Sequence, residues 1–120
     1  MQLYDWSSIE TEQLNPLFKR QCIHSDRMTV ARIWLAKGCI VPEHRHENEQ
    51  LGVLASGTMR FRIGEETREL GPGATWCIPA NVPHEVEAGP EGAVAVEVFA
   101  PRRDDWGGLE RLPASRPQWP

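Results

Sequence analysis

The sequence predicts an all-β fold, either a sandwich or a barrel of short strands. Its 120 residues include 10 glycines and 10 prolines, which divide the chain at intervals of about ten residues. The segments between these turns are short, and they are either apolar or alternating, with no long helical period among them. A chain of this length suits one domain with a single core.

The clearest strand alternates cleanly, with Met59, Phe61 and Ile63 on one face and Arg60 and Arg62 on the other. A period of two predicts a half-buried strand with one face in solvent. Glycine and proline turns bound the other segments and favour hairpins between them. We expect strands over residues 17–24, 28–36, 50–56, 58–63, 66–70, 74–78, 84–87 and 93–99.

Composition excludes several classes of protein. The net charge of −4 offers no basic stripe for phosphates, so we expect no nucleic-acid partner. The apolar runs are too short for a membrane-spanning helix, and the first residues show no secretory signal pattern. Cys22, Cys39 and Cys77 are odd in number and form no CxxC pair, which favours free thiols in a cytoplasmic protein.

Two histidines separated by one residue, His44 and His46, indicate a metal site. In an extended strand residues i and i+2 point to the same face, so both imidazoles can reach one point. Gln50 follows a short polar turn and offers an amide oxygen, and His84 offers a further imidazole. Because neutral imidazole is the commonest protein ligand for transition metals, we expect these four side chains to hold a metal ion.

The last expected strand has two different faces. Val94, Val96 and Val98 share one face, which we expect to be a packing face. The opposite face has small alanines followed by Glu97 and Phe99. Either small residues leave a space that the carboxylate faces as a candidate acid or base, or this face is exposed to solvent.

Arg32 is an unusual charge in an apolar segment. It shares a strand face with Val30 and Trp34. Either that face is an exposed edge, or Arg32 points into a polar pocket, where it would be a candidate for binding a substrate.

The histidine spacing resembles the two conserved motifs of the cupins, which are small jelly-roll β-barrels. The first motif is matched by Gly38-x5-His44-x-His46-x3-Gln50-x6-Gly57, and the second by Gly73-x5-Pro79-x-Asn81-x2-His84. The resemblance covers roughly residues 28–100. It implies a jelly-roll barrel that holds a metal ion inside through the three histidines and a fourth ligand.

Gln50 stands where cupins usually have a glutamate. Three neutral imidazoles and a neutral amide leave a divalent ion with its full charge, which suits a Lewis acid that attracts an anionic substrate. The same ligands suit oxygen activation less well. They accept zinc, nickel, iron, cobalt or manganese. The alternative is a degenerate site in which Gln50 marks the loss of metal binding.

The run from His44 to Gln50, together with residues 97–106, resembles the pectin-degradation cupins. That family converts 4,5-unsaturated uronate monosaccharides to linear ketonised forms. The resemblance implies that Glu97, where the family typically has aspartate, is the acid–base group. It also implies that Phe99 packs against the sugar and Arg103 binds the carboxylate. Alternatively, Arg103 belongs to a solvated charge run with the aspartates that follow it.

The sequence is compatible with two other functions. One is another metal-dependent cupin enzyme, such as a dioxygenase or a lyase acting on a small organic acid, and the other is a non-enzymatic small-molecule binding module. The strand over 50–56 is apolar on both faces, so its outer face needs cover and we expect a homodimer. We expect one cupin domain over residues 1–106, with an N-terminal extension over 1–27 and a proline-rich tail over 107–120.

Overall fold

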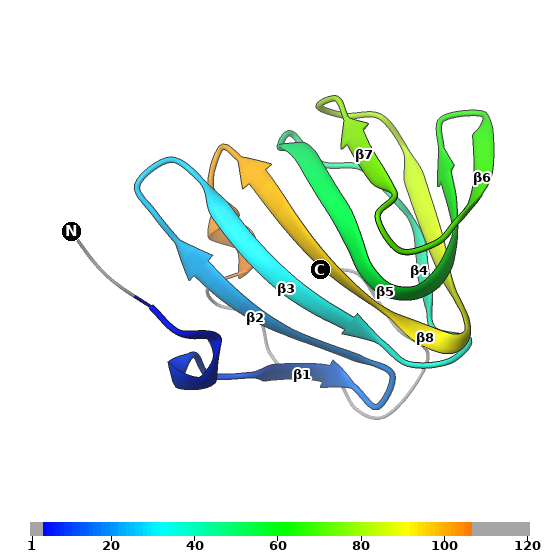
Figure 1. The fold of residues 1–120 in the computed structure, drawn as a ribbon. Coiled ribbons are helices and arrows are strands. Elements are labelled where there is room, and N and C mark those ends of the chain that lie inside the picture. Colours follow the sequence, from blue (N-terminus) through cyan, green and yellow to red (C-terminus); the bar gives the residue numbers. More distant parts are fainter. Residues whose placement is uncertain (1–3, 107–120) are drawn as a thin grey trace.

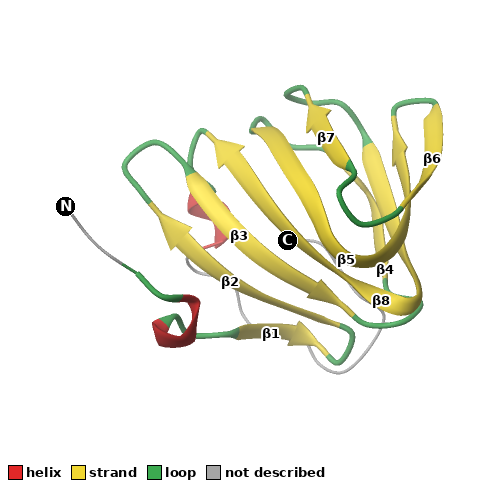
Figure 2. Ribbon diagram, in the orientation of Figure 1, coloured by secondary structure: helices red, strands yellow, loops and turns green. Residues whose placement is uncertain are grey.

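Antiparallel strands make up nearly all of the regular structure in the computed structural model, which describes residues 4–106 (Figures 1 and 2). The predicted all-β fold is confirmed, whereas the predicted tail over 107–120 lies outside the described residues. In chain order the elements are η1 (Trp6–Ser8), β1 (Glu12–Asn15), β2 (Phe18–His24), β3 (Thr29–Leu35), β4 (Ile40–His44), β5 (Glu49–Ile63), β6 (Glu66–Leu70), β7 (Thr75–Ile78), β8 (His84–Ala100) and η2 (Asp104–Trp106).

Two long strands, β5 and β8, run through both layers of the barrel. In one layer, β1, β2 and β3 continue into the C-terminal half of β8, then into the N-terminal half of β5 and β7. In the other layer, β4 pairs with the N-terminal half of β8, which pairs with the C-terminal half of β5 and then β6. Figure 1 shows β5 in green and β8 in yellow curving from one layer into the other.

The bend between the layers falls at Gly57 and Gly92. Both have left-handed backbone conformations, with φ of +79° and +75°, which glycine adopts without steric strain. They also approach closely, since a Cβ on Gly57 would lie 2.0 Å from the Gly92 oxygen. The register shifts in β5 beside Gly57, and the inward face of β8 changes from even-numbered to odd-numbered residues across Gly92.

This bend explains where the predicted strands differ from the observed ones. The segments predicted over 50–56 and 58–63 form one strand, and so do those over 84–87 and 93–99. Glycines that signal turns in the sequence bend these strands without ending them, because β5 and β8 bend together and remain paired on both sides. β1 and β4 lie outside the predicted strands.

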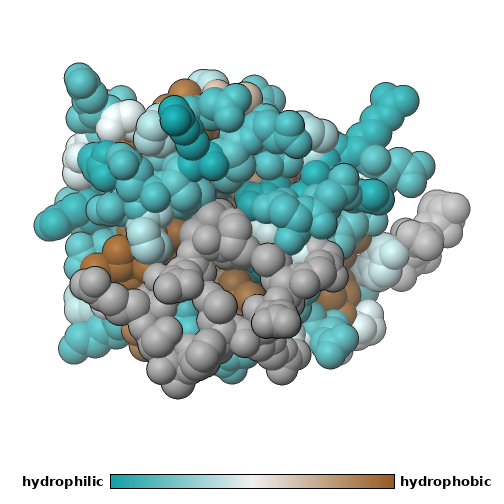
Figure 3. Space-filling view, turned by 180° about the vertical axis from the view of Figure 1, so that it is seen from behind, coloured by the Kyte–Doolittle hydropathy of each residue, from teal (hydrophilic) through white to brown (hydrophobic). Residues whose placement is uncertain are grey.

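The core lies between the layers and includes Phe18, Leu54, Ile78 and Phe99, all essentially inaccessible to solvent. The predicted inward face of the second half of β5 is confirmed, with Met59 buried. On the face seen from behind the view of Figure 1, the described residues are mainly hydrophilic, with smaller hydrophobic patches (Figure 3). Among the described residues no helix is long and apolar enough to cross a membrane.

The valine face of β8, expected to be a packing face, lies outside the core. Val94, Val96 and Val98 are half-buried on the outer side of the sheet, while Glu97 and Phe99 point inward. Small alanines leave room inside the barrel for the larger side chains that share their face.

Candidate metal centre and acid–base site

Three histidines meet at one end of the barrel. His44 ends β4 and lies opposite His84, which begins β8, in the register of these two strands. His46 follows in the next loop. The ring centroids of His44 and His84 are 4.2 Å apart, and His46 lies 5.0 Å from His84 and 5.7 Å from His44. Ligating nitrogens of the three rings lie within 4.8 Å of one another, close enough to hold one metal ion.

Backbone carbonyl groups fix the tautomer of all three rings. A carbonyl oxygen can only accept a hydrogen bond, so each Nδ1 beside one carries the proton and each Nε2 presents a lone pair. Such outer partners are the usual way in which metal-binding histidines are oriented. The Nδ1–oxygen distances are 2.7 Å from His44 to Pro42, 2.9 Å from His46 to Asn48 and 2.8 Å from His84 to Val82.

Burial keeps these imidazoles neutral. It lowers the pKa of His44 to about 3 and that of His84 to about 4. It also lowers the pKa of His46, with a further contribution from the Arg103 charge. The Nε2 atom of His84 is buried without a hydrogen-bond partner among the described residues. Neutral rings with inward Nε2 atoms are the form that binds a transition metal.

Gln50 completes a set of four possible donors. Its Nε2 donates a 2.7 Å hydrogen bond to Glu97, so its Oε1 faces the histidines and lies 3.1 Å from His46 Nε2. With the proton of His46 on Nδ1, these two atoms are both acceptors, and a cation between them would resolve their repulsion. The residues therefore fit a divalent metal ion.

Glu97 lies directly beside these ligands. Its side chain is buried, and its Oε1 accepts hydrogen bonds from Gln50 Nε2 at 2.7 Å and from Trp76 Nε1 at 3.1 Å. Burial raises the pKa of Glu97 to about 7, although the two hydrogen bonds act in the opposite direction. A carboxyl group that titrates near neutrality can both accept and donate a proton under physiological conditions.

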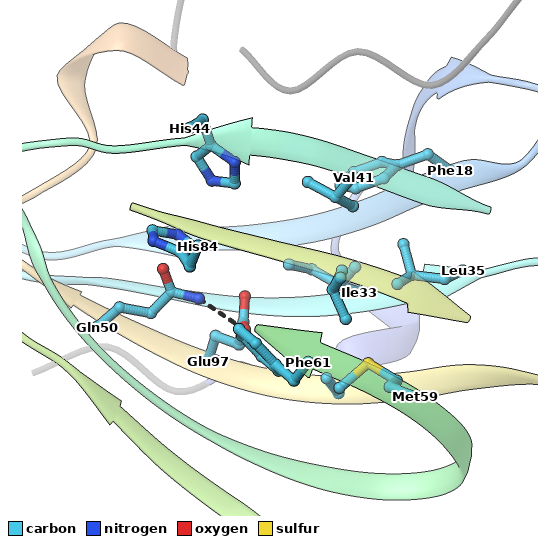
Figure 4. Close-up of a pocket in the computed structure, with 12 residues that line it drawn as sticks. Phe18, Ile33, Leu35, Val41, His44, Gln50, Met59, Phe61, His84 and Glu97 are labelled. Atoms are coloured by element: carbon cyan, nitrogen blue, oxygen red, sulfur yellow. Dashed lines mark hydrogen bonds between the residues drawn. The ribbon is translucent and has the colours of Figure 1, made fainter. Parts of the chain in front are cut away.

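The interior pocket has a polar end and an apolar end (Figure 4). Glu97, Gln50, His44 and His84 gather at one end, and the hydrogen bond between Gln50 and Glu97 links them. The apolar wall extends away from them and is formed by Phe18, Ile33, Leu35, Val41, Met59, Phe61, Val86 and Ala95.

Phe99 lies beside His46, and Arg103 lies beside Phe99. The Phe99 ring is 5.7 Å from the His46 ring, and the Arg103 guanidinium is 5.1 Å from the Phe99 centroid. Arg103 is 1% exposed and stacks on Trp106 at 4.2 Å. It binds the Asp105 carboxylate through Nε at 3.0 Å and Nη2 at 2.8 Å. The charge run predicted as an alternative does form local ion pairs, but Arg103 itself is buried.

Arg32 does not reach the pocket. Its neighbours Ala31 and Ile33 point inward and are buried, so the alternation of β3 places Arg32 on the outer face. There its guanidinium lies 4.6 Å from the Trp34 ring and 6.0 Å from the Trp6 ring. The polar-pocket interpretation of Arg32 therefore does not agree with the structure, and we assign it no part in the site.

Trp76 belongs to the site although the sequence analysis did not identify it. Trp76 and Ile78 lie two residues apart on β7 and are both buried, so both point into the barrel. The polar contact of Trp76 depends on a glycine, Gly52, that lies 24 positions earlier in the chain and directly opposite it. Parity could have placed Trp76 inside the barrel, but only the strand register shows which carboxylate it meets.

An antiparallel barrel with inward histidines from two strands is the architecture of the cupins. Residues 32–99 match the cupin domain family (Cupin_2), and the chain belongs to this family. It is 32% identical over 97 residues to the pectin degradation protein KdgF of Dickeya dadantii. The aligned region covers 79% of this chain and 88% of that protein. This match confirms the resemblance to the pectin-degradation cupins.

Solved structures share the fold. KdgF from Halomonas sp. superposes with a TM-score of 0.82 at 22% identity, covering 88% of this chain and 97% of that one. An RmlC-like cupin from Shewanella frigidimarina gives a TM-score of 0.83, also at 22% identity, covering 88% of this chain and 96% of that one. At this level of identity the two superpositions establish the jelly-roll fold.

Proposed function

We propose that this cupin is a metal-dependent enzyme that converts 4,5-unsaturated uronate monosaccharides to their linear keto forms. The observation that carries the proposal is the buried Glu97 carboxyl group, which is hydrogen-bonded to one of four candidate metal ligands. The relative from Dickeya dadantii, named for pectin degradation, supports the substrate class.

His44, His46, His84 and Gln50 would hold one divalent transition metal ion. When bound, the ion would supply Lewis-acid polarisation of a substrate oxygen. The donor set, three imidazoles and an amide oxygen, is compatible with zinc, nickel, iron, cobalt or manganese.

The reaction is an isomerisation, so it needs no oxidant or reductant. The bond between the anomeric carbon and the ring oxygen breaks. The anomeric hydroxyl loses its proton and becomes a carbonyl, and the ring oxygen gains a proton and becomes an enol. The enol then loses its oxygen-bound proton while the adjacent alkene carbon gains one. Glu97 would accept and return these protons, a role worth about 10²–10⁴ in rate.

Arg103 and Phe99 would orient the sugar acid. A guanidinium suits a carboxylate through paired hydrogen bonds. Asp105 binds the Nε–Nη2 edge of Arg103 and so holds the guanidinium beside the Phe99 ring. Phe99, beside His46, would pack against the apolar face of the sugar.

The test follows the loss of the ultraviolet absorbance of the substrate double bond with protein reconstituted with each candidate metal. We expect turnover by the wild type and large losses in Glu97→Gln and Arg103→Ala. Full activity in both variants would contradict the assigned roles. Oxygen consumption coupled to loss of substrate would indicate a dioxygenase instead, because the proposed reaction uses no oxygen.

We also propose a homodimer formed through the outer face of β5. Leu51 is 50% exposed and Val53 is 38% exposed. They pair with the half-buried Val98 and Val96 of β8, which makes a continuous apolar surface. Light scattering at micromolar concentration should give twice the chain mass for the wild type and the chain mass for Leu51→Glu. A monomeric wild type would contradict the dimer.

A cytoplasmic location is part of the same proposal. Cys22, Cys39 and Cys77 are all free thiols, and free thiols are typical of a reducing compartment.

A further inference from the structure

Trp76, Gly52 and Glu97 form a row across three neighbouring strands. Gly52 of β5 lies opposite Trp76 of β7 on one side and opposite Glu97 of β8 on the other. Trp76 and Glu97 are buried, and they meet through a hydrogen bond from Nε1 to Oε1 of 3.1 Å. This contact therefore spans the width of one strand.

The missing side chain of Gly52 makes this contact possible. A Cβ atom at this position would lie 2.3 Å from Trp76 Cε2 and 2.4 Å from Trp76 Nε1. Any larger residue would displace the indole ring from its path across β5. Phe61 packs against the same ring with a centroid separation of 5.1 Å, which limits its movement further.

The two oxygens of Glu97 differ in their surroundings. Oε1 accepts from both Gln50 and Trp76, whereas Oε2 accepts no hydrogen bond from the described residues. Two N–H donors engage both lone pairs of Oε1. A proton added to this carboxyl group therefore goes to Oε2.

We propose that Trp76 is a positioning residue that, with Gln50, holds Oε1 of Glu97 and leaves Oε2 to exchange the proton with substrate. This inference rests on the proposed function. A proton leaves Oε2 for the substrate carbon as the alkene electron pair forms the new C–H bond. The enol O–H then returns its proton to Oε2, and its bonding electrons form the ketone.

The first test uses Trp76→Phe, which keeps an aromatic ring and removes the indole N–H. Because the substitution removes a hydrogen bond to a charged group, we expect kcat to fall about tenfold or more. KM should stay within about twofold of the wild-type value. The effect should disappear in a Glu97→Gln background, because Trp76 acts through Glu97. Trp34→Phe, on the outer face of β3, is the matched control and should retain full activity. An unchanged kcat in Trp76→Phe, or an equal loss with and without Glu97, would overturn the inference.

The second test needs no substrate. In zinc-loaded, ¹⁵N-labelled protein the indole signal of Trp76, identified by its loss in Trp76→Phe, should show slow proton exchange. In Glu97→Leu it should move upfield and exchange faster, while the Trp34 signal stays in place. Gly52→Ala, which keeps the indole but blocks its path, should have the same effect. A Trp76 signal that is unaffected in both variants would overturn the inference. If the wild type does not turn over the uronate, the proposed function fails, and this signal still decides whether Trp76 holds Glu97.

Discussion

Glu87 and Glu97 lie on the same strand in opposite surroundings. Glu87 is exposed and lies 3.9 Å from Arg60, which also pairs with Glu69. Glu97 is buried and accepts hydrogen bonds from Gln50 and an indole. Ten residues separate the two glutamates, so a regular alternation would place them on one face. The bend at Gly92 turns the second one inward, and this change of face creates the candidate acid–base site.

The difference between Glu87 and Glu97 should be greatest in their effect on catalysis. Glu97→Gln keeps the size of the side chain but cannot exchange a proton, so we expect kcat on the unsaturated uronate to fall by about 10²–10⁴. Glu87→Gln is the same substitution on the outer face and should leave kcat unchanged. Steady-state kinetics of both variants make the comparison. Equal effects would show that the position of the carboxyl group is unimportant.

The bend itself can be broken at Gly57. An alanine there must adopt a left-handed backbone and also overlap the Gly92 carbonyl, so we expect the free energy of unfolding to fall by about 3 kcal/mol. In Gly64→Ala the nearest atom, on Val82, is 4.0 Å away, and only the backbone strain of about 1 kcal/mol should remain. Urea denaturation measures both, and equal losses would argue against close packing at the bend.

Gln50 links the metal ligands to Glu97, and Gln50→Glu tests that link. The substitution removes the N–H donor and places a second carboxylate beside Glu97, which disfavours ionisation of both. We expect kcat to fall about tenfold or more while the protein still binds metal. Kinetics with metal content measured on the same sample would check this. Activity equal to the wild type would show that the amide donor is dispensable.

The exposed ion pairs should matter least. Solvent and salt screen pairs such as Arg60–Glu69 and Arg60–Glu87, so Arg60→Ala should leave the urea midpoint unchanged within error. Stability that falls markedly, and falls further at low salt, would contradict this view of the outer face.

The histidine cluster could be predicted from the sequence because strand alternation acts over two residues and the motif spacing is local. The inward orientation of Glu97 and Phe99 could also be predicted, as one of two alternatives. Which of the two faces points into the barrel depends on Gly57 and Gly92, and the sequence around these glycines indicates turns. These glycines bend the strands without ending them because β5 and β8 stay paired on both sides of the bend. That pairing joins segments far apart in the chain, so the local sequence does not reveal it.

The outward positions of Arg32 and of the valines of β8 could not be predicted for the same reason. Period-two patterns identify which residues share a face, but not which face points inward. Inside this barrel, alanines beside Glu97 leave space for polar side chains, so the more hydrophobic face lies outside. Trp76 was missed because its role depends on the absence of a side chain at Gly52, a relation that requires the register of β5 and β7.

We propose one metal site formed by His44 of β4, His46 of the loop that follows, His84 of β8 and Gln50 of β5. Elemental analysis after reconstitution and gel filtration tests this site, with His84→Ala as the variant and His24→Ala, a histidine on β2 outside the cluster, as the control. We predict one divalent ion per chain in the wild type and His24→Ala, and almost none in His84→Ala. A wild type that retains no transition metal, or a His84→Ala variant that retains as much, would contradict this proposal.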